Sequence, residues 1–399
     1  MLSYHFLLDL SLILLSTKVL GLVTRRFKMP QVVGALLAGL VLGPAMLNIL
    51  KETDFILQLS ELGVIVLMFC AGLESDLEDL KKTGKTSFII AVLGVLVPLI
   101  GGFLVGHFYG YISGDTGNTF LKNIFIGIVL TATSVSITVE TLKEMGKLNT
   151  SVGTAILGAA IIDDILGIVG LTLVTSLSDT SVNVSSVLLK IVGFFIFAII
   201  VGIIFYNIFK RWSEREDRDR RRFIIAAFVF CLVFAYISEE IFNVAGITGA
   251  FIAGLTLSNI NKKEYIEARL GVVSYTLLSP VFFASIGLKI VLPKMDINMI
   301  IFATLLTIVA ILSKIIGCGL GAKLCKYSKK ESFQIGIGMV SRGEVALIVA
   351  SKGAALGLIS STMLGPIVIV AVITTIISPI LLKLAFRSKK ESLQVDLVK

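Results

Sequence analysis

Charged residues and histidines are scarce in this sequence of 399 residues. Only 16 % of the residues are charged and two are histidines, whereas 56 % are hydrophobic and the mean hydropathy is +0.96. Soluble domains carry about 25 % charged residues, so a soluble globular or disordered chain is excluded. One membrane-spanning helix with a short loop uses about 30 residues. The length therefore accommodates about 13 spans, without a large extramembrane domain.

Cysteine and targeting signals are also sparse. The four cysteines lie in or beside apolar stretches without metal-ligand spacing, which indicates buried thiols and no disulfide framework. The N-terminal residues lack a basic region and a small-residue cleavage site, so they are interpreted as a retained first span rather than a signal peptide.

Thirteen apolar stretches are separated by charged or Gly/Pro/Asn-rich segments. They predict an all-α integral membrane protein with about 13 transmembrane helices. The predicted spans are 3–24, 30–49, 55–73, 86–111, 121–142, 149–177, 185–209, 221–239, 242–260, 268–290, 297–322, 332–358 and 361–386.

The basic residues are distributed unevenly between the two sides of these spans. Loops after odd-numbered spans and the C-terminal tail hold 27 Lys and Arg residues, whereas loops after even-numbered spans hold 4. Because basic loops stay in the cytoplasm, the N-terminus is predicted outside and the C-terminus inside the cell membrane. The net charge of +9 thus reflects topology and contact with anionic lipid rather than nucleic-acid binding.

Two segments of the chain resemble each other at an offset of 215 residues. VVGALLAGLVLG (32–43) and ITGAFIAGLTLS (247–258) share six of twelve positions, and the same offset aligns Gly72 with Gly287. The copies begin at the second and ninth spans. An odd separation makes the two halves face opposite ways, which predicts inverted repeats of the kind found in secondary transporters. Helix packing through small residues is the alternative explanation.

Few charges remain inside the predicted spans, and each is costly there. Asp163 and Asp164 lie in the middle of an uncharged run, and Lys314 lies in the middle of another. Adjacent helical residues point about 100° apart, so the two aspartates face different neighbours. Lys314 is the natural partner of one of them, either as part of a functional site or as a purely structural ion pair.

Two further segments carry polar groups inside spans. TATSVSIT (131–138) contains Thr133 and Ser134, and SRGEVALIVAS (341–351) contains Arg342 and Glu344. The offset of 215 aligns 131–136 with 346–351, which predicts broken helices at corresponding positions of the two halves. Hydroxyls and freed carbonyls at such breaks can ligate a cation. The alternative is that these hydroxyls only bond back to their own helix.

Several motifs together resemble bacterial sodium/proton antiporters of the NapA/GerN type. This type belongs to the monovalent cation:proton antiporter family that also contains the Kef potassium-efflux systems. The motifs cover nearly the whole chain: MPQVVGALLAGLVLGP (29–44), LMFCAGLESDL (67–77), TATSVSITVETLKEMG (131–146), AAIIDDILGIV (159–169), PVFFASIGLKI (280–290) and GMVSRGEVALIVASKG (338–353).

The resemblance implies a homodimer of thirteen-helix subunits with inverted repeats. It assigns 1–73 and 185–290 to dimerisation-domain helices with a linker, 86–177 and 297–386 to the ion-transport core, and 387–399 to a cytoplasmic tail. In the core, two broken helices cross in the spans that hold 131–136 and 342–350.

The resemblance also implies roles for individual residues. Asp164 takes the position of the cation-binding aspartate, Asp163 pairs with Lys314, and Thr133 and Ser134 match hydroxyls at the helix crossing. Sodium or lithium is then bound by Asp164 and Asp163 in exchange for protons, without a cofactor and without enzymatic activity. The Asp-Asp pair points to electrogenic exchange, while Arg342 and Glu344 are candidates for gating or pH sensing.

Other functions fit the sequence less well. A potassium/proton antiporter or Kef-like potassium-efflux protein is the nearest alternative, and a substrate:sodium symporter of similar architecture is the next. An intramembrane aspartyl protease needs its two carboxylates on separate helices, whereas these two are adjacent in one. The ion preference, stoichiometry, pH dependence and resting conformation do not follow from the sequence.

Overall fold

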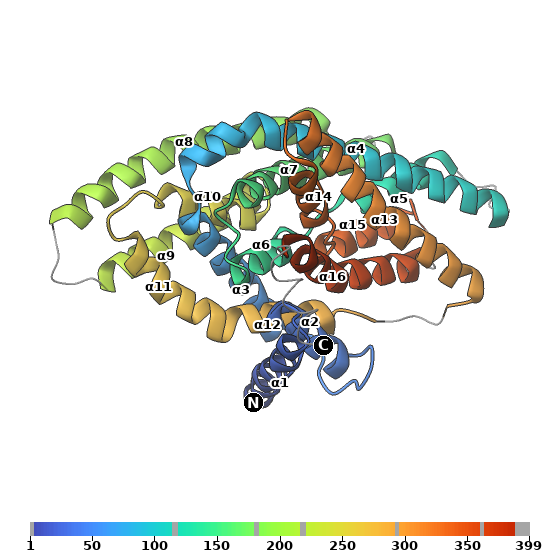
Figure 1. The fold of residues 1–399 in the computed structure, drawn as a ribbon, viewed down its shortest axis with the longest axis horizontal. Helices are drawn as coiled ribbons and strands as arrows, with labels where there is room; N and C mark the ends of the chain where they lie inside the picture. Colours follow the sequence, from blue (N-terminus) through green and yellow to red (C-terminus); the bar gives the residue numbers. More distant parts are fainter. Residues whose placement is uncertain are drawn as a thin grey trace, which may run out of the picture.

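The computed structural model describes residues 4–113, 119–178, 183–215, 221–291, 295–359 and 363–387 of the chain (Figure 1). The predicted cytoplasmic tail, 387–399, lies outside these residues except for Arg387, and the side chain of Glu344 is likewise outside the described part.

All regular structure in the described residues is helical. The elements are α1 (His5–Arg26), α2 (Gln31–Leu42), α3 (Asp54–Glu74), α4 (Leu77–Ser113), α5 (Thr119–Thr131), α6 (Val135–Glu144), α7 (Ser151–Ser178), α8 (Val184–Arg215), α9 (Arg221–Tyr236), η1 (Ile237–Ile241), α10 (Gly246–Thr256), α11 (Lys263–Val273), η2 (Ser274–Leu278), α12 (Ser279–Leu288), α13 (Ile297–Leu324), α14 (Lys329–Gly338), α15 (Glu344–Ala355) and α16 (Leu364–Phe386), where η denotes a π-helical turn.

Each predicted span coincides with one helix or with a run of consecutive helices. The stretch 121–142 is divided into α5 and α6, and the stretch 332–358 into α14 and α15. Among the described residues, ten helical segments are long and apolar enough to cross a bilayer, while α2, α10 and 345–355 are shorter apolar helices. The structure is thus an all-helical multi-pass membrane protein, and the exact number of crossings stays a prediction.

The helices pack in two groups. In one group, α4 contacts α5, α7 and α13, and α13 contacts α14 and α16; this group occupies the top, centre and right of Figure 1. In the other, α2 packs against α1 and α12, and α3 packs against α10 and α12. Packing within one chain does not test the predicted roles of 1–73 and 185–290 in dimerisation or of 86–177 and 297–386 in transport, so these assignments stay predictions.

Two close helix crossings relate the segments that resemble each other in sequence. A Cβ atom on Gly39 of α2 would lie 1.9 Å from a carbonyl oxygen of α12, and one on Gly287 of α12 would lie 2.4 Å from a backbone nitrogen of α2. Likewise, a Cβ atom on Gly254 of α10 or on Gly72 of α3 would lie 2.1 Å from a carbonyl oxygen of the other helix. Only glycine permits such approach. Each half therefore contributes one partner to each crossing, which is consistent with the predicted repeat.

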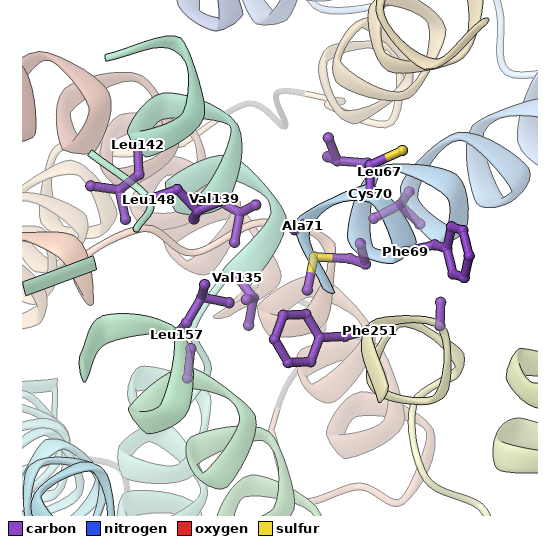
Figure 2. Close-up of a cluster of buried hydrophobic side chains, with 14 of the residues drawn as sticks. Leu67, Phe69, Cys70, Ala71, Val135, Val139, Leu142, Leu148, Leu157 and Phe251 are labelled. Carbon is purple, nitrogen blue, oxygen red and sulfur yellow. The ribbon is translucent and has the colours of Figure 1, made fainter. Parts of the chain in front are cut away.

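A buried apolar cluster connects the two groups beside α6. Figure 2 shows Ala71 of α3 and Phe251 of α10 on the side of the cluster that faces the α6 side chains Val135 and Val139, with Phe69 of α3 on the far side. These side chains are at most 3 % exposed. The cluster excludes water from the contact between α3 and α6, and α6 begins next to the polar segment described below.

Candidate functional site

Asp163 and Lys314 form an ion pair inside the helix bundle. The Lys314 ammonium of α13 donates to Asp163 Oδ1 at 2.9 Å and to Oδ2 at 3.1 Å, and the two side chains are 0 % and 1 % exposed. Desolvating two charges costs several kcal/mol per ion, and the close bidentate contact offsets part of that cost. A buried pair of this kind is weak evidence for stability and a strong candidate for function.

The room for this ion pair is provided by α4. A Cβ atom on Gly94 would lie 2.5 Å from Cys318 Sγ and 3.9 Å from both Asp163 Oδ1 and Lys314 Nζ. Any larger residue at position 94 would clash with Cys318 beside the ion pair. Gly94 is not predictable from the sequence, because no local signal separates it from the other helix-packing glycines.

Asp164 lines a small cavity beside the Asp163–Lys314 ion pair. The cavity has a volume of about 70 Å³ and is lined by both aspartates together with Ile128, Thr131, Ala132, Thr133, Gly167, Ile168, Leu171, Val345 and Val349. Asp163 is 2 % exposed, whereas Asp164 is only partly buried. The 100° between adjacent helical residues thus places one carboxylate on the lysine and exposes its neighbour to the cavity.

Thr133 contributes a hydroxyl to this cavity. Its side chain lies beside Asp163 and is 2 % exposed. The hydroxyl oxygen does not complete a hydrogen bond of regular geometry. Together with two carboxylates, it forms an all-oxygen donor set of the kind that suits a hard cation.

The chain is interrupted at two places that cross next to this cavity. Residues 132–134 separate α5 from α6, and residues 339–343 separate α14 from α15. The Ser134 N–H donates to Ser341 O at 2.8 Å, and the Ser341 hydroxyl donates to Ser134 O at 2.7 Å. The Thr138 hydroxyl donates to Gly338 O at 2.7 Å. The orphaned backbone groups of the two breaks therefore satisfy one another.

The position of the second break corrects one expectation. The offset of 215 aligned 131–136 with 346–351, but 346–351 lies wholly inside α15 and the break is at 339–343. A constant offset cannot register insertions between the two halves, so it placed the corresponding segment about two turns too far along the chain. The segment inferred by resemblance, 342–350, includes only the end of the break.

The two predicted hydroxyl ligands differ in their surroundings. Ser134 is 1 % exposed, but it is not among the residues that line the cavity. Its hydroxyl lies 3.4 Å from the Ser136 hydroxyl and faces Gly343. Thr131 lines the cavity, and its hydroxyl bonds back to Ile128 O at 2.7 Å, which is the structural alternative weighed for such residues. The structure thus brings together Asp163, Asp164, Thr133 and Lys314, with Ser134 at the adjoining crossing.

Arg342 is fully buried and binds carbonyl oxygens from three segments. Its Nη2 donates to Leu130 O of α5 at 2.7 Å and to Ala310 O of α13 at 2.9 Å, and its Nη1 donates to Val340 O at 2.9 Å. The Thr375 hydroxyl of α16 donates to Arg342 O. A cation at the C-terminal end of α5 also balances the negative end of that helix dipole. These partners indicate a residue that holds the helix break in place.

We expect the substitution Arg342→Met to lower the free energy of unfolding by about 1–3 kcal/mol for each carbonyl left without a donor. Thermal melting in detergent measures the loss. Lys352→Met is the matched control, because Lys352 is exposed on α15 and its removal should change stability by less than about 0.5 kcal/mol. An Arg342→Met protein with unchanged melting but a displaced pH profile of transport would instead assign Arg342 to pH sensing.

The side-chain donors around the cavity limit the kinds of ion that the site can bind. Within the residues that the structure describes, no group of three or more His, Cys, Asp and Glu side chains is placed to hold a metal ion. The two carboxylates and the hydroxyl at the cavity are few and oxygen-only. Such a set is suited to the reversible binding of a small hard cation rather than to the tight retention of a transition metal.

Comparison with known proteins gives matches over nearly the entire chain. Residues 11–387 match the family described as sodium/hydrogen exchanger, transmembrane. The chain is 40 % identical over 395 residues to the Na(+)/H(+)-K(+) antiporter GerN of Bacillus cereus, covering 99 % of this chain and 100 % of that protein. It is 37 % identical over 383 residues to a Na(+)/H(+) antiporter of Enterococcus hirae, covering 95 % and 97 %.

A similar fold occurs in the sodium proton antiporter MjNhaP1 of Methanocaldococcus jannaschii. An electron-microscopy structure of that protein superposes with a TM-score of 0.75 at 19 % sequence identity and covers 96 % of each chain. A structure of the same protein at pH 8 gives a TM-score of 0.68 at 21 % identity. At these identities the likeness establishes a shared fold.

Proposed function

The chain belongs to the sodium/hydrogen exchanger family, and from this premise we propose that it is a secondary active antiporter that exchanges sodium or lithium for protons. The observation that carries the proposal is the cavity lined by Asp163, Asp164 and the buried residue Thr133. A carboxylate that faces such a cavity binds either a proton or a cation. Competition for one site couples the two fluxes without direct contact between the ions. The family is one of transporters, and we infer no enzymatic reaction.

We propose that Asp164 is the shared site and that Asp163 and Lys314 set the charge carried. In the proton-loaded state Asp164 is protonated and Asp163 pairs with the Lys314 ammonium. Sodium then binds both carboxylates beside Thr133, while Asp164 and Lys314 each release a proton. Two protons leave for each cation that enters, so one net charge moves in each cycle. A membrane potential that is negative inside then drives sodium out.

The proposed orientation places the N-terminus outside and the C-terminus in the cytoplasm of the cell membrane. In that orientation α7 runs outward from Ser151, and the cavity residues Gly167 and Leu171 lie beyond Asp164 toward the outside. Alternating access follows when the group of α4, α5, α7 and α13 moves against the group of α1, α2, α3 and α12. The homodimer and the contact of basic loops with anionic lipid are part of the same proposal.

Transport of potassium is the second candidate, because the relative from Bacillus cereus is named a Na(+)/H(+)-K(+) antiporter. The donor set of the site does not by itself select among monovalent cations. The exchange of potassium for protons uses the same cavity and the same competition.

Purified protein in proteoliposomes tests these alternatives. Sodium, lithium and potassium are added in turn, and proton flux is followed with a pH-sensitive dye. We expect sodium and lithium to drive proton flux, and clamping the potential with potassium and valinomycin should change the rate because charge moves. Flux with potassium alone would assign the second candidate, and no cation-dependent flux would refute antiport.

A further inference from the structure

We propose that two polar contacts at the cytoplasmic end of α6 form a latch that holds the helix groups in the arrangement seen in this structure. The latch consists of the hydrogen bond from Gln31 N to Glu144 and the ion pair between Lys143 and Glu74. It joins α6 to α2 and α3. The inference rests on the proposed antiport function and its orientation, and it adds the residues that set the balance between the two faces.

Glu144 of α6 caps the N-terminus of α2, where the N-cap residue of α2 makes no side-chain capping bond. The N-cap residue of α2 is Pro30, which makes no side-chain capping bond. Instead, the Gln31 N–H donates to Glu144 Oε2 at 2.7 Å across 113 residues of sequence. A carboxylate at a helix N-terminus satisfies an orphaned N–H and interacts favourably with the helix dipole. The end of α2 is therefore complete only while α6 stays beside it.

The ion pair between Lys143 and Glu74 ties α6 to a second helix. Glu74 is the last residue of α3, and the Lys143 and Glu74 side chains are 31 % and 14 % exposed. This partial burial distinguishes the pair from fully solvated surface pairs, which contribute little. Both latch contacts lie within the last turn of α6, so they are made or broken together.

The start of α6 lies at the helix crossing beside the cation cavity. Its N-cap residue is Ser134, which is bonded to Ser341 of the second break. A ten-residue helix is about 15 Å long and transmits a displacement from one end to the other. A movement of the cation site against α2 and α3 must therefore break the latch.

The contact surface next to the latch is not tightly packed. A cavity of about 430 Å³ lies between α6 and the elements α1, α2, η2 and α12, and Glu140, Lys143 and Glu144 line its α6 side. Apolar packing is missing there, so little dispersion energy is lost when α6 moves away. On that side the Glu144 cap is the contact that resists separation, and on the other side the Lys143–Glu74 ion pair adds to the apolar cluster between α6 and α3.

A similar carboxylate cap at the N-terminus of α10 serves as the control, because it does not connect the two helix groups. The N-terminus of α10, which resembles α2 in sequence, is capped by Glu239, whose Oε2 accepts from Gly246 N at 2.6 Å. Glu239 is exposed like Glu144, but it belongs to η1, directly before α10. Removing this cap weakens a helix end without affecting the contact between α6 and α2.

The test uses a single cysteine at position 139. Val139 of α6 is 1 % exposed and lies in the cluster between α6 and α3 (Figure 2). In protein whose four native cysteines are replaced by alanine, Val139→Cys reacts with N-ethylmaleimide only when α6 separates from α3. We expect Glu144→Ala to raise the reaction rate roughly tenfold, the effect of losing one charge-assisted hydrogen bond. Glu239→Ala should leave it unchanged.

A charge exchange provides the second variant. Lys143→Glu alone should raise the reaction rate, and the combination of Lys143→Glu with Glu74→Lys should return it toward the parent value. The latch is refuted if Glu144→Ala has no effect, if Glu239→Ala acts equally, or if the charge exchange fails to restore the parent rate. Cysteine reactivity is measured without ion flux, so these outcomes are independent of whether sodium/proton exchange is itself confirmed.

Discussion

The substitution Asp164→Asn is expected to abolish cation-dependent proton flux in proteoliposomes. The amide of asparagine retains the shape of the side chain but neither binds a proton at physiological pH nor carries the charge that holds a cation. Loss of the charged partner of a desolvated ion costs about 3–5 kcal/mol, which corresponds to a fall in flux of roughly 10²- to 10⁴-fold. Dye-based flux measured with saturating sodium gives the comparison.

Glu61→Gln is the control for Asp164→Asn. Glu61 is an exposed carboxylate on α3 and does not line the cation cavity, so the same chemical change there should leave most of the flux. Both proteins should give the same elution profile in detergent. Flux that survives in Asp164→Asn would remove Asp164 from the role of shared site.

The substitution Lys314→Met is expected to lower the free energy of unfolding by an amount similar to the free-energy cost of Asp164→Asn. Methionine fills most of the space of the lysine stem but leaves Asp163 buried without its cation. Breaking a buried ion pair from one side costs about 3–5 kcal/mol, because the remaining charge has no compensation. The melting temperature in lipid or detergent should fall accordingly.

The double variant Asp163→Asn with Lys314→Met distinguishes the ion pair from the packing around it. Removal of both charges also removes the desolvation cost, so most of the stability lost in Lys314→Met should return. If the melting temperature of the double variant is as low as that of the single variant, the loss is due to packing at Gly94 and Cys318 rather than to charge.

Much of the fold follows from local properties of the sequence. Hydropathy and the scarcity of charge located the apolar helices of the described residues but not the breaks within them, because burial in a membrane depends on the apolar character of each stretch whatever its neighbours are. The same scarcity drew attention to Asp163, Asp164 and Lys314, since each buried charge is costly. The proximity of Asp163 to Lys314 was an expectation from resemblance, and the structure places the two side chains in contact.

Other features of the site depend on contacts between distant segments. The second helix break lies at 339–343 rather than at 346–351, because the Ser134 and Ser341 backbones meet there. The sequence alone also left open whether Arg342 serves as a gate or as a structural residue. Its partners are carbonyl oxygens on α5, α13 and its own break, and two of these are far from it in sequence.

The sequence by itself determined that this protein is a membrane bundle with a few costly buried charges, since transfer free energies are properties of single residues and short stretches. Only the tertiary structure decided that Thr133 rather than Ser134 lines the cavity, that Arg342 binds carbonyl oxygens of α5 and α13, and that Glu144 caps α2. Those choices depend on how helices more than 100 residues apart pack against one another. Hydrogen bonds and ion pairs act only at short range, so their partners are fixed after the helices have been brought together.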